Sequence, residues 1–248
     1  MSNSLLRKYL IVDSNKYANP SDFTVNLTAF QTKDFYHFRV LDLTVPYTYY
    51  DVFGQYLTLN YTVRDTHIPQ DNTTTLTISA GNYNITSLKA ELQNKLNANN
   101  QFGEHYTVDI STINGKMSIS TNNARYQISI TGGDLRTIIG WKNTVSSFSQ
   151  VSTSPYVINP YPIDMLYLES SLNSVSIYSA SEDRTTRTIA TMVPNLQPFD
   201  VLYRNYENPL VLSFPDESLN SISFKLVDRL GNIIDLNGQG IVFTIEFF

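Results

Sequence analysis

The feature that most constrains the fold of this chain is an alternation of apolar and polar residues with a period of two. In one example, Leu57, Leu59 and Tyr61 alternate with polar residues. Such alternation is typical of antiparallel strands that bury one face and expose the other. The sequence therefore predicts an all-β, antiparallel fold with strands in six segments, 23–27, 57–63, 106–110, 126–130, 222–226 and 241–247.

Turn signals separate these segments. Asn114-Gly115 lies between two alternating runs and predicts a two-residue hairpin. Near the end of the chain, two polar segments, 228–232 and 236–240, are each flanked by apolar runs. Glycine next to asparagine in both segments favours tight turns, because these residues adopt left-handed backbone conformations at the lowest cost.

Only one segment carries a clear helical pattern. In residues 86–100, Leu88, Leu92 and Leu96 are four apart and form one apolar stripe. Thr86 or Ser87 is expected to cap the start of this helix, and Glu91 and Lys95 form a favourable pair. A second, shorter helical turn is predicted within residues 133–141.

The number of predicted strands exceeds what one jelly roll needs. Roughly a dozen strands are expected, whereas a jelly roll uses about eight. The predicted helix lies among the surplus strands. We therefore expect a single jelly-roll β-sandwich formed by residues 1–54 and 152–248, interrupted by a small α+β insertion at 55–151.

Composition excludes several classes of protein. The 248-residue chain has no cysteine, which excludes disulfides and cysteine-based zinc or redox sites. Its net charge is −5 and it has no basic run, so direct nucleic-acid binding is not expected. The N-terminal segment lacks an apolar stretch as long as that of a signal peptide, and no window is apolar enough for a membrane span.

The residues that usually carry enzyme chemistry form no recognisable motif. His37, His67 and His105 are far apart in the sequence and are expected to be structural or solvated. There is no nucleophile elbow, P-loop or dinucleotide fingerprint. The sequence therefore predicts no enzyme activity, no catalytic residues, no metal site and no cofactor.

Acidic residues leave two weaker possibilities. A pair of carboxylates could act as in glycosidases, although their spacing specifies no pair; the candidates are Asp13, Asp22, Asp42, Asp51, Asp228 and Asp235. Four residues near the C-terminus could bind Ca²⁺ through oxygen atoms. We expect them instead to cap turns through their own backbone; they are Asp228, Asn232, Asp235 and Asn237.

Aromatic residues are abundant and clustered. The chain has 17 Tyr and 13 Phe, with clusters in segments 46–56 and 161–170. Tyrosine suits subunit interfaces because it combines a large contact area with a polar tip. Packing within the β-core is the other interpretation, and stacking of carbohydrate on exposed tyrosines is a third.

Three segments, taken together, resemble a known group of proteins. The C-terminal "SLNSISFKLVDRLGNIIDLNGQGIVFTIEF" (218–247) resembles the terminal signature of penton, or minor capsid, proteins of virophages and Polinton-like viruses. "YLIVDSNKYANPSDFTVNL" (9–27) and "LTISAGNYNITSLKAELQNKLN" (76–97) resemble segments of related capsid proteins. The terminal motif has Gly240-Ile241 where an aromatic residue is expected.

This resemblance implies a structural role in a virion. It implies a jelly-roll subunit that forms homopentamers at the fivefold vertices of an icosahedral capsid, next to a double-jelly-roll major capsid protein. It further implies assembly in the host cytoplasm and an insertion that contacts a spike or a host receptor. The last strand of such a jelly roll is expected to pair within a sheet built by earlier strands, with Asp228, Asn232 and Asn237-Gly238 shaping its turns.

Two other functions remain open from the sequence. One is a minor, cement or spike-base capsid protein outside the vertex, which would be a trimer or a monomer. The other is a glycan-binding β-sandwich module for receptor attachment. Oligomeric state distinguishes the first from a penton, and binding to glycans distinguishes the second.

Overall fold

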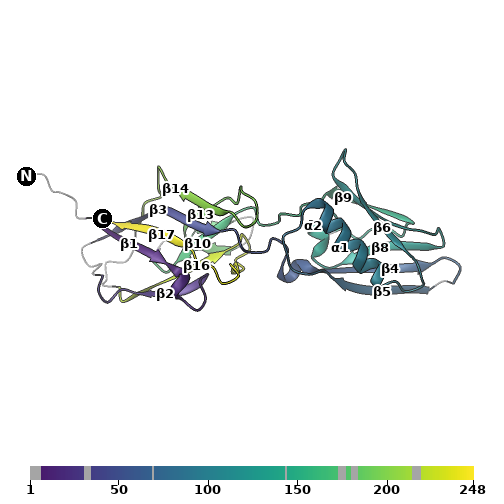
Figure 1. The fold of residues 1–248 in the computed structure, drawn as a ribbon, viewed down its shortest axis with the longest axis horizontal. Coiled ribbons are helices and arrows are strands. Elements are labelled where there is room, and N and C mark those ends of the chain that lie inside the picture. The colour runs from purple at the N-terminus through teal and green to yellow at the C-terminus, as the bar shows by residue number, and fades with distance from the viewer. Residues whose placement is uncertain are drawn as a thin grey trace, which may run out of the picture. The chain divides into compact units, whose positions relative to one another are not determined.

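A computed structural model describes residues 7–30, 35–68, 70–142, 144–172, 177–179, 184–213 and 219–248. The chain divides into two compact units (Figure 1). Met1–Tyr49 and Ile163–Phe248 form the first, here called the jelly-roll unit. Tyr50–Pro162 form the second, here called the inserted unit. Among the described residues, no helix is long and apolar enough to cross a membrane.

The jelly-roll unit contains two antiparallel sheets. The first has the order β1-β17-β3-β14, with β15 also paired to β3; these strands are Lys8–Asp13, Val242–Phe247, His37–Pro46, Val201–Asn205 and Leu212–Ser213. The second has the order β13-β10-β16-β2, formed by Thr188–Met192, Leu166–Ser170, Ser221–Val227 and Asp22–Asn26. A separate short pair is formed by β11 (Ile177–Ser179) and β12 (Arg184–Thr186), and a 3-10 helix covers Ser14–Lys16.

The core of this unit lies between the two sheets. Phe224 on β16 and Phe243 on β17 are both fully buried, and their ring centroids are 4.9 Å apart at an interplanar angle of 71°. Phe23 on β2 packs against Phe224 at 5.6 Å. Such edge-to-face packing adds to the free energy gained from burying the rings themselves. The predicted all-β jelly-roll class is confirmed.

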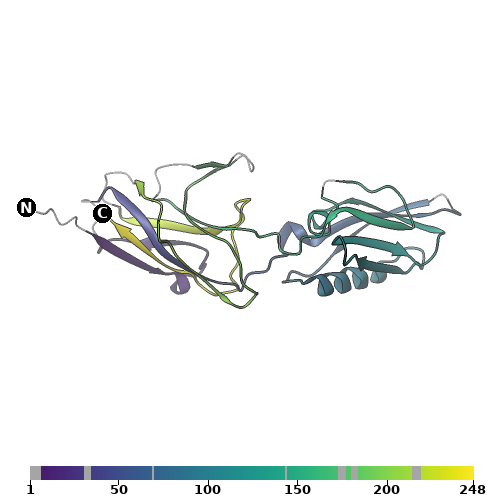
Figure 2. The ribbon, with the colours of Figure 1, turned by 90° about the horizontal axis from the view of Figure 1, so that it is seen from above.

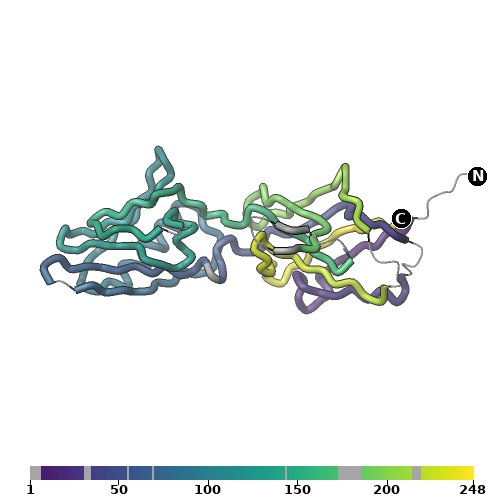
Figure 3. Tube along the Cα trace, turned by 180° about the vertical axis from the view of Figure 1, so that it is seen from behind, coloured from purple at the N-terminus to yellow at the C-terminus, as the bar shows by residue number. Residues whose placement is uncertain are grey.

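The terminal strand occupies the interior of its sheet, as expected. β17 pairs with β1 on one side, where Asp13 is opposite Val242, and with β3 on the other. Figure 3 shows β1, in purple, and β17, in yellow, side by side. All backbone donors and acceptors of a central strand must find partners. This requirement explains why the strongest alternation in the sequence falls at its end.

The two turns before β17 have the predicted chemistry. The carboxylate of Asp228 accepts hydrogen bonds from the backbone N–H and the side-chain amide of Asn232, both at 2.8 Å. Gly231 has a positive φ of 89° within this turn. In the second turn, Asn237 and Gly238 have φ angles of 52° and 80°. Left-handed backbone of this kind is why glycine and asparagine stand at these positions.

The inserted unit packs two three-stranded sheets and two helices around a second core. One sheet has the order β5-β4-β8, formed by Gln70–Thr77, Thr58–Asp65 and Tyr126–Gly132. The other has the order β6-β7-β9, formed by Tyr106–Ile110, Lys116–Thr121 and Val151–Val157. The helices are α1 (Ile85–Ala98) and α2 (Leu135–Ile138), and Gly54–Leu57 form a 3-10 helix. Figure 2 shows α1 on one side of the strands.

The predicted helix forms, but its cap differs from the expectation. Leu88, Leu92 and Leu96 are fully buried on one stripe, and Glu91 lies 3.9 Å from Lys95. The N-cap is Asn84, whose side chain accepts a hydrogen bond from the backbone N–H of Ser87 at 2.9 Å. Ser87 therefore completes a reciprocal capping box from inside the first turn and does not itself cap the helix.

Two further expectations are corrected by the inserted unit. The hairpin between β6 and β7 is a five-residue loop, 111–115, in which Gly115 has a φ of 64° and donates its N–H to the carbonyl of Ser111. It is not the two-residue turn predicted from Asn114-Gly115. The compact units divide at Tyr50 and Pro162, whereas the predicted boundaries are 54/55 and 151/152; the C-terminal boundary moves because β9, which begins at Val151, pairs with β7.

Candidate assembly surface

The acidic residues near the C-terminus stabilise turns of the backbone. Asp228 bonds Asn232, and Asp235 accepts the backbone N–H of Asn237 at 2.8 Å. The amide of Asn237 donates to the carbonyl oxygen of Thr48. These polar atoms are therefore used to hold loop geometry. In the part of the chain that the structure describes, no three acidic or histidine side chains gather as a metal site would require.

The other candidate carboxylates are in separate environments. Asp13 caps the 3-10 helix by accepting the N–H of Asn15 at 3.0 Å, which lowers the pKa of Asp13. Asp22 lies 3.5 Å from Lys225, and Asp51 is buried in the inserted unit. Asp42 lies on β3, opposite Thr244 of β17. These candidate carboxylates therefore lie on different elements of the fold.

The three histidines are likewise dispersed. His37 begins β3, with its Nδ1 3.2 Å from the hydroxyl of Ser213. His67 lies in the turn after β4, and His105 precedes β6. All three side chains are exposed. Their positions on different elements give them no shared chemistry.

The predicted aromatic clusters are divided between core and surface. Tyr47 and Tyr49 are buried and stacked, with ring centroids 4.6 Å apart. Tyr50 and Tyr161 are exposed. Core packing therefore accounts for part of each cluster, and the exposed apolar surface of the jelly-roll unit comes mainly from other segments.

One exposed apolar patch lies on the edge strand β1. Tyr9 and Ile11 point away from the core and are 53% and 71% exposed, whereas Val12 between the sheets is buried. Within the described residues, β1 pairs with β17 alone, so its other side is an open sheet edge. We call Tyr9 and Ile11 the β1 patch.

A second patch lies on β14. Phe199, which precedes the strand, and Val201 and Tyr203 on it are 78%, 58% and 64% exposed, whereas Leu202 is buried. The N–H of Phe199 donates to the carbonyl of Tyr47, so the pairing with β3 continues beyond the strand itself. Within the described residues β14 pairs with β3 alone, and Arg204 near its end donates to the carbonyl oxygen of Thr191 on β13. We call Phe199, Val201 and Tyr203 the β14 patch.

The two patches lie at opposite edges of the same sheet. Its order, β1-β17-β3-β14, places two strands between them. Strand spacing of about 4.8 Å puts the edges roughly 14 Å apart. Burying one exposed Ile, Tyr, Phe or Val side chain contributes about 1.5–3 kcal/mol. Because the two patches lie at different edges of the sheet's outward face, this surface fits association with more than one neighbour.

A buried ionic cluster lies on the outward face of this sheet, between the two patches. The carboxylate of Glu246 on β17 is 1% exposed and accepts hydrogen bonds from Arg7 and Tyr9, both at 3.1 Å, and from Arg39 at 2.5 Å. Burial alone would raise the pKa of Glu246, but bonds from Arg39 and Tyr9 and the charges of Arg39 and Arg7 lower it. The cluster fixes the Tyr9 side chain of the β1 patch.

Sequence reasoning missed both patches for an identifiable reason. The segment Tyr9–Val12 is continuously apolar, and such a run is usually assigned to a strand buried on both faces. In the structure it is an edge strand with one apolar face exposed. Val201, Leu202 and Tyr203 form a second continuous run on an edge strand. The signal in the sequence that could have located the two patches was a continuous apolar run next to polar turn residues.

Comparison with known proteins gives a family and a fold. The profile of a family described as "Family of unknown function (DUF5901)" matches residues 10–227. A search of curated proteins found no match. Among solved structures, a chain of the SeMet-labelled mavirus penton protein matches with a TM-score of 0.53 at 12% identity, covering 97% of this chain and 98% of that one. At this identity the similarity is one of fold, and the resemblance noted in the sequence is confirmed as a penton-like fold.

Proposed function

This chain belongs to the DUF5901 family of unknown function, and from its own structure we propose that it is a structural capsid protein, the penton subunit of an icosahedral vertex. The observation that carries the proposal is the pair of apolar patches at opposite edges of one sheet, on a fold similar to that of a viral penton protein. Its location is the virion, at the capsid vertices, and it is not an enzyme.

The two patches support a specific mode of self-association. A contact between unlike surfaces of identical subunits generates a closed ring when the rotation between neighbours closes. The β14 patch of one copy packs against the β1 patch of the next copy, so each subunit uses both edges. Strand edges that carry unpaired backbone groups also favour such contacts. Five copies close the ring, and the double-jelly-roll major capsid protein surrounds it in the assembled capsid.

The finer features of the proposal follow from the resemblance. The chain is a protein of a virophage, a Polinton-like virus or a related virus, and assembly takes place in the cytoplasm of the host. The inserted unit contacts a spike or a host receptor. A minor, cement or spike-base protein outside the vertex is the alternative, and it predicts a trimer or a monomer.

Oligomeric state tests the proposal directly. Native mass spectrometry of the purified full chain is expected to show a complex of five copies. A stable trimer, or a monomer at all protein concentrations, would contradict the vertex assignment and favour the alternative.

Two complementary variants test the mode of association. Ile11→Asp in the β1 patch and Tyr203→Asp in the β14 patch should each prevent ring closure, because each places a charge in a desolvated contact. When the two variants are mixed, each still offers one intact patch, so a heterodimer is expected and a larger ring is not. Ile113→Asp is the control, since Ile113 is 96% exposed at a hairpin loop of the inserted unit. Pentamers formed by either patch variant alone would refute this arrangement.

A further inference from the structure

The turn that precedes β14 places a phenylalanine where the backbone favours glycine. Residues 197–200 form a β-turn, in which the N–H of Asp200 donates to the carbonyl oxygen of Gln197 at 3.2 Å. Phe199 is the second of its two central residues and has a φ of 75°. With Pro198 before it, this is the pattern of a type II turn, whose second central position is normally glycine or asparagine.

This backbone conformation is unfavourable for a bulky side chain. At a positive φ the Cβ atom comes too close to a backbone carbonyl oxygen, and glycine avoids the penalty because it has no Cβ. Among the described residues, three that are not glycine have a positive φ, and Phe199 alone is aromatic; they are Lys142, Phe199 and Asn237. The requirements of the turn therefore do not explain why phenylalanine stands at this position.

Burial within the subunit does not explain the phenylalanine either. Phe199 is 78% exposed, whereas every other phenylalanine that the structure describes is buried or half-buried. A ring that stays in water gains little from the hydrophobic effect. The single subunit therefore carries an unfavourable turn conformation without a compensating gain from packing of the Phe199 ring.

Hydrogen bonds hold this turn against the end of β3. The N–H of Phe199 donates to the carbonyl oxygen of Tyr47, and the N–H of Tyr47 donates to that of Asp200, both at 2.8 Å. The carboxylate of Asp200 also accepts the N–H of Gln197 at 3.3 Å. The surrounding structure thus imposes the positive φ and fixes the point from which the ring projects. Such preorganisation reduces the entropy that is lost when a partner covers the ring.

We propose that Phe199 is the anchor of the contact between copies of this chain, where its ring is buried against the β1 patch of the next copy. Strained residues that the surrounding structure holds in place are common at binding sites, and a few aromatic anchors carry most of the energy of an interface. The partner is a second copy because Phe199 continues the β14 patch, two residues before Val201 and four before Tyr203. The inference therefore rests on the self-association proposed above.

Glycine at this position should change association and subunit stability in opposite directions. Phe199→Gly removes the ring and also the unfavourable Cβ. In sedimentation equilibrium of the full chain, we expect the concentration at which half of the chains are assembled to rise by about thirtyfold or more.

Subunit stability is measured in the Ile11→Asp background, in which contact between copies is blocked. There Phe199→Gly should raise the midpoint of thermal unfolding of the jelly-roll unit by about 2–5 °C. Circular dichroism follows this transition, and Trp141 fluorescence, which reports the inserted unit, should not change.

Two further variants separate the ring from the backbone. Phe199→Ala removes the ring but keeps a Cβ at the positive φ, so it should weaken association as much as glycine does without raising the unfolding midpoint. Ile113→Ala is the matched control for loss of an exposed apolar side chain, because Ile113 is 96% exposed on the inserted unit. It should change neither association nor the midpoint of the jelly-roll unit.

Two results would overturn the inference. The first is unchanged association of Phe199→Gly, which would leave the exposed ring without a role between copies. The second is a lower unfolding midpoint, which would show that the ring stabilises the subunit itself.

Native mass spectrometry of the same samples counts the copies and so tests the capsid role separately. A trimer that requires Phe199 would contradict the vertex assignment and support the anchor, whereas a pentamer that does not require Phe199 would do the reverse. A chain that is monomeric at all concentrations would contradict both.

Discussion

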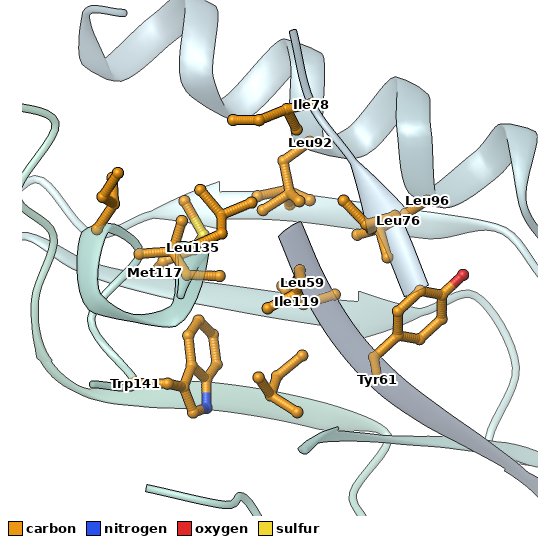
Figure 4. Packing of buried hydrophobic residues seen from close by; sticks show 14 of the residues in the cluster. Leu59, Tyr61, Leu76, Ile78, Leu92, Leu96, Met117, Ile119, Leu135 and Trp141 are labelled. Carbon is orange, nitrogen blue, oxygen red and sulfur yellow. The ribbon is translucent and has the colours of Figure 1, made fainter. Parts of the chain in front are cut away.

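The two units of this chain use the same alternating strands but close their sheets over very different distances in the sequence. In the jelly-roll unit, β1 at the start of the chain pairs with β17 at its end, with Asp13 opposite Val242. In the inserted unit, all strand pairings lie within Tyr50–Pro162, and α1 covers one side of them. The core of the inserted unit is likewise formed within this range, by buried residues from Val52 to Ile158 (Figure 4).

The inserted unit therefore forms its core without residues of the jelly-roll unit, although its segment interrupts the sequence of that unit. Pairings between distant segments must overcome a larger loop-closure entropy before they contribute stability. The inserted unit incurs a smaller cost because its paired strands lie nearer to each other in the sequence. Its helix also satisfies an open strand edge, since Gln93 and Asn97 on α1 accept the backbone N–H groups of Val108 and Tyr106 on β6.

Removal of the terminal strand should give the largest difference in stability between the two units. Deleting residues 242–248 takes away a central strand that β1 and β3 both require. We expect the jelly-roll unit to fail to fold and the inserted unit to keep its own cooperative unfolding transition. Fluorescence of Trp141 follows the inserted unit alone, and far-ultraviolet circular dichroism follows both. Loss of the Trp141 transition in the truncated chain would show that the inserted unit cannot fold without its host.

Two glycines with the same backbone angle give a smaller and more local comparison. Gly133 in the inserted unit and Gly238 in the jelly-roll unit both have a φ of 80°. A Cβ at Gly133 would overlap the carbonyl oxygen of Thr58 and lie 2.8 Å from the Cα of Leu59, whereas a Cβ at Gly238 would meet nothing within 4 Å.

Gly133→Ala should therefore destabilise the inserted unit by about 3 kcal/mol or more, because backbone atoms must move. Gly238→Ala should cost about 1–2 kcal/mol, which is the left-handed backbone penalty alone. Chemical denaturation followed by Trp141 fluorescence and by circular dichroism measures each effect in its own unit. Equal losses of stability at the two sites would show that the close approach of the Thr58 backbone does not add to the cost of the substitution.

The ionic cluster of the jelly-roll unit should give a smaller effect than Gly133→Ala does, and one that depends on pH. Because its partners lower the pKa of Glu246 in the folded state, the stabilisation is present above the ordinary carboxyl pKa and is lost as the pH falls through the folded value. Glu246→Gln should cost about 2 kcal/mol at neutral pH, since Arg39 loses a charged partner.

The same substitution should reduce the acid sensitivity of the jelly-roll unit without moving the Trp141 transition. Circular dichroism and fluorescence unfolding curves at neutral and acid pH provide the comparison. A variant that remains as acid-sensitive as the unaltered protein would exclude Glu246 as the titrating group.

Local patterns in the sequence were sufficient to predict several of the elements. Period-two alternation located strands such as β16 and β17, and the spacing of Leu88, Leu92 and Leu96 located α1. The turn at Asp228–Asn232 could be predicted because the side chains that shape it bond to neighbours in the chain. These features depend on interactions between residues close in sequence, so the sequence by itself determined them.

Tertiary structure alone decided what those elements face. The run Tyr9–Val12 is apolar throughout, and only the position of β1 at a sheet edge leaves Tyr9 and Ile11 exposed. The loop after α2 is likewise placed by the tertiary structure, since the Ser146 hydroxyl accepts the backbone N–H of Ile130 on β8. The physical reason is that exposure depends on which segments pack together, and partners far apart in the sequence leave no local pattern to identify them.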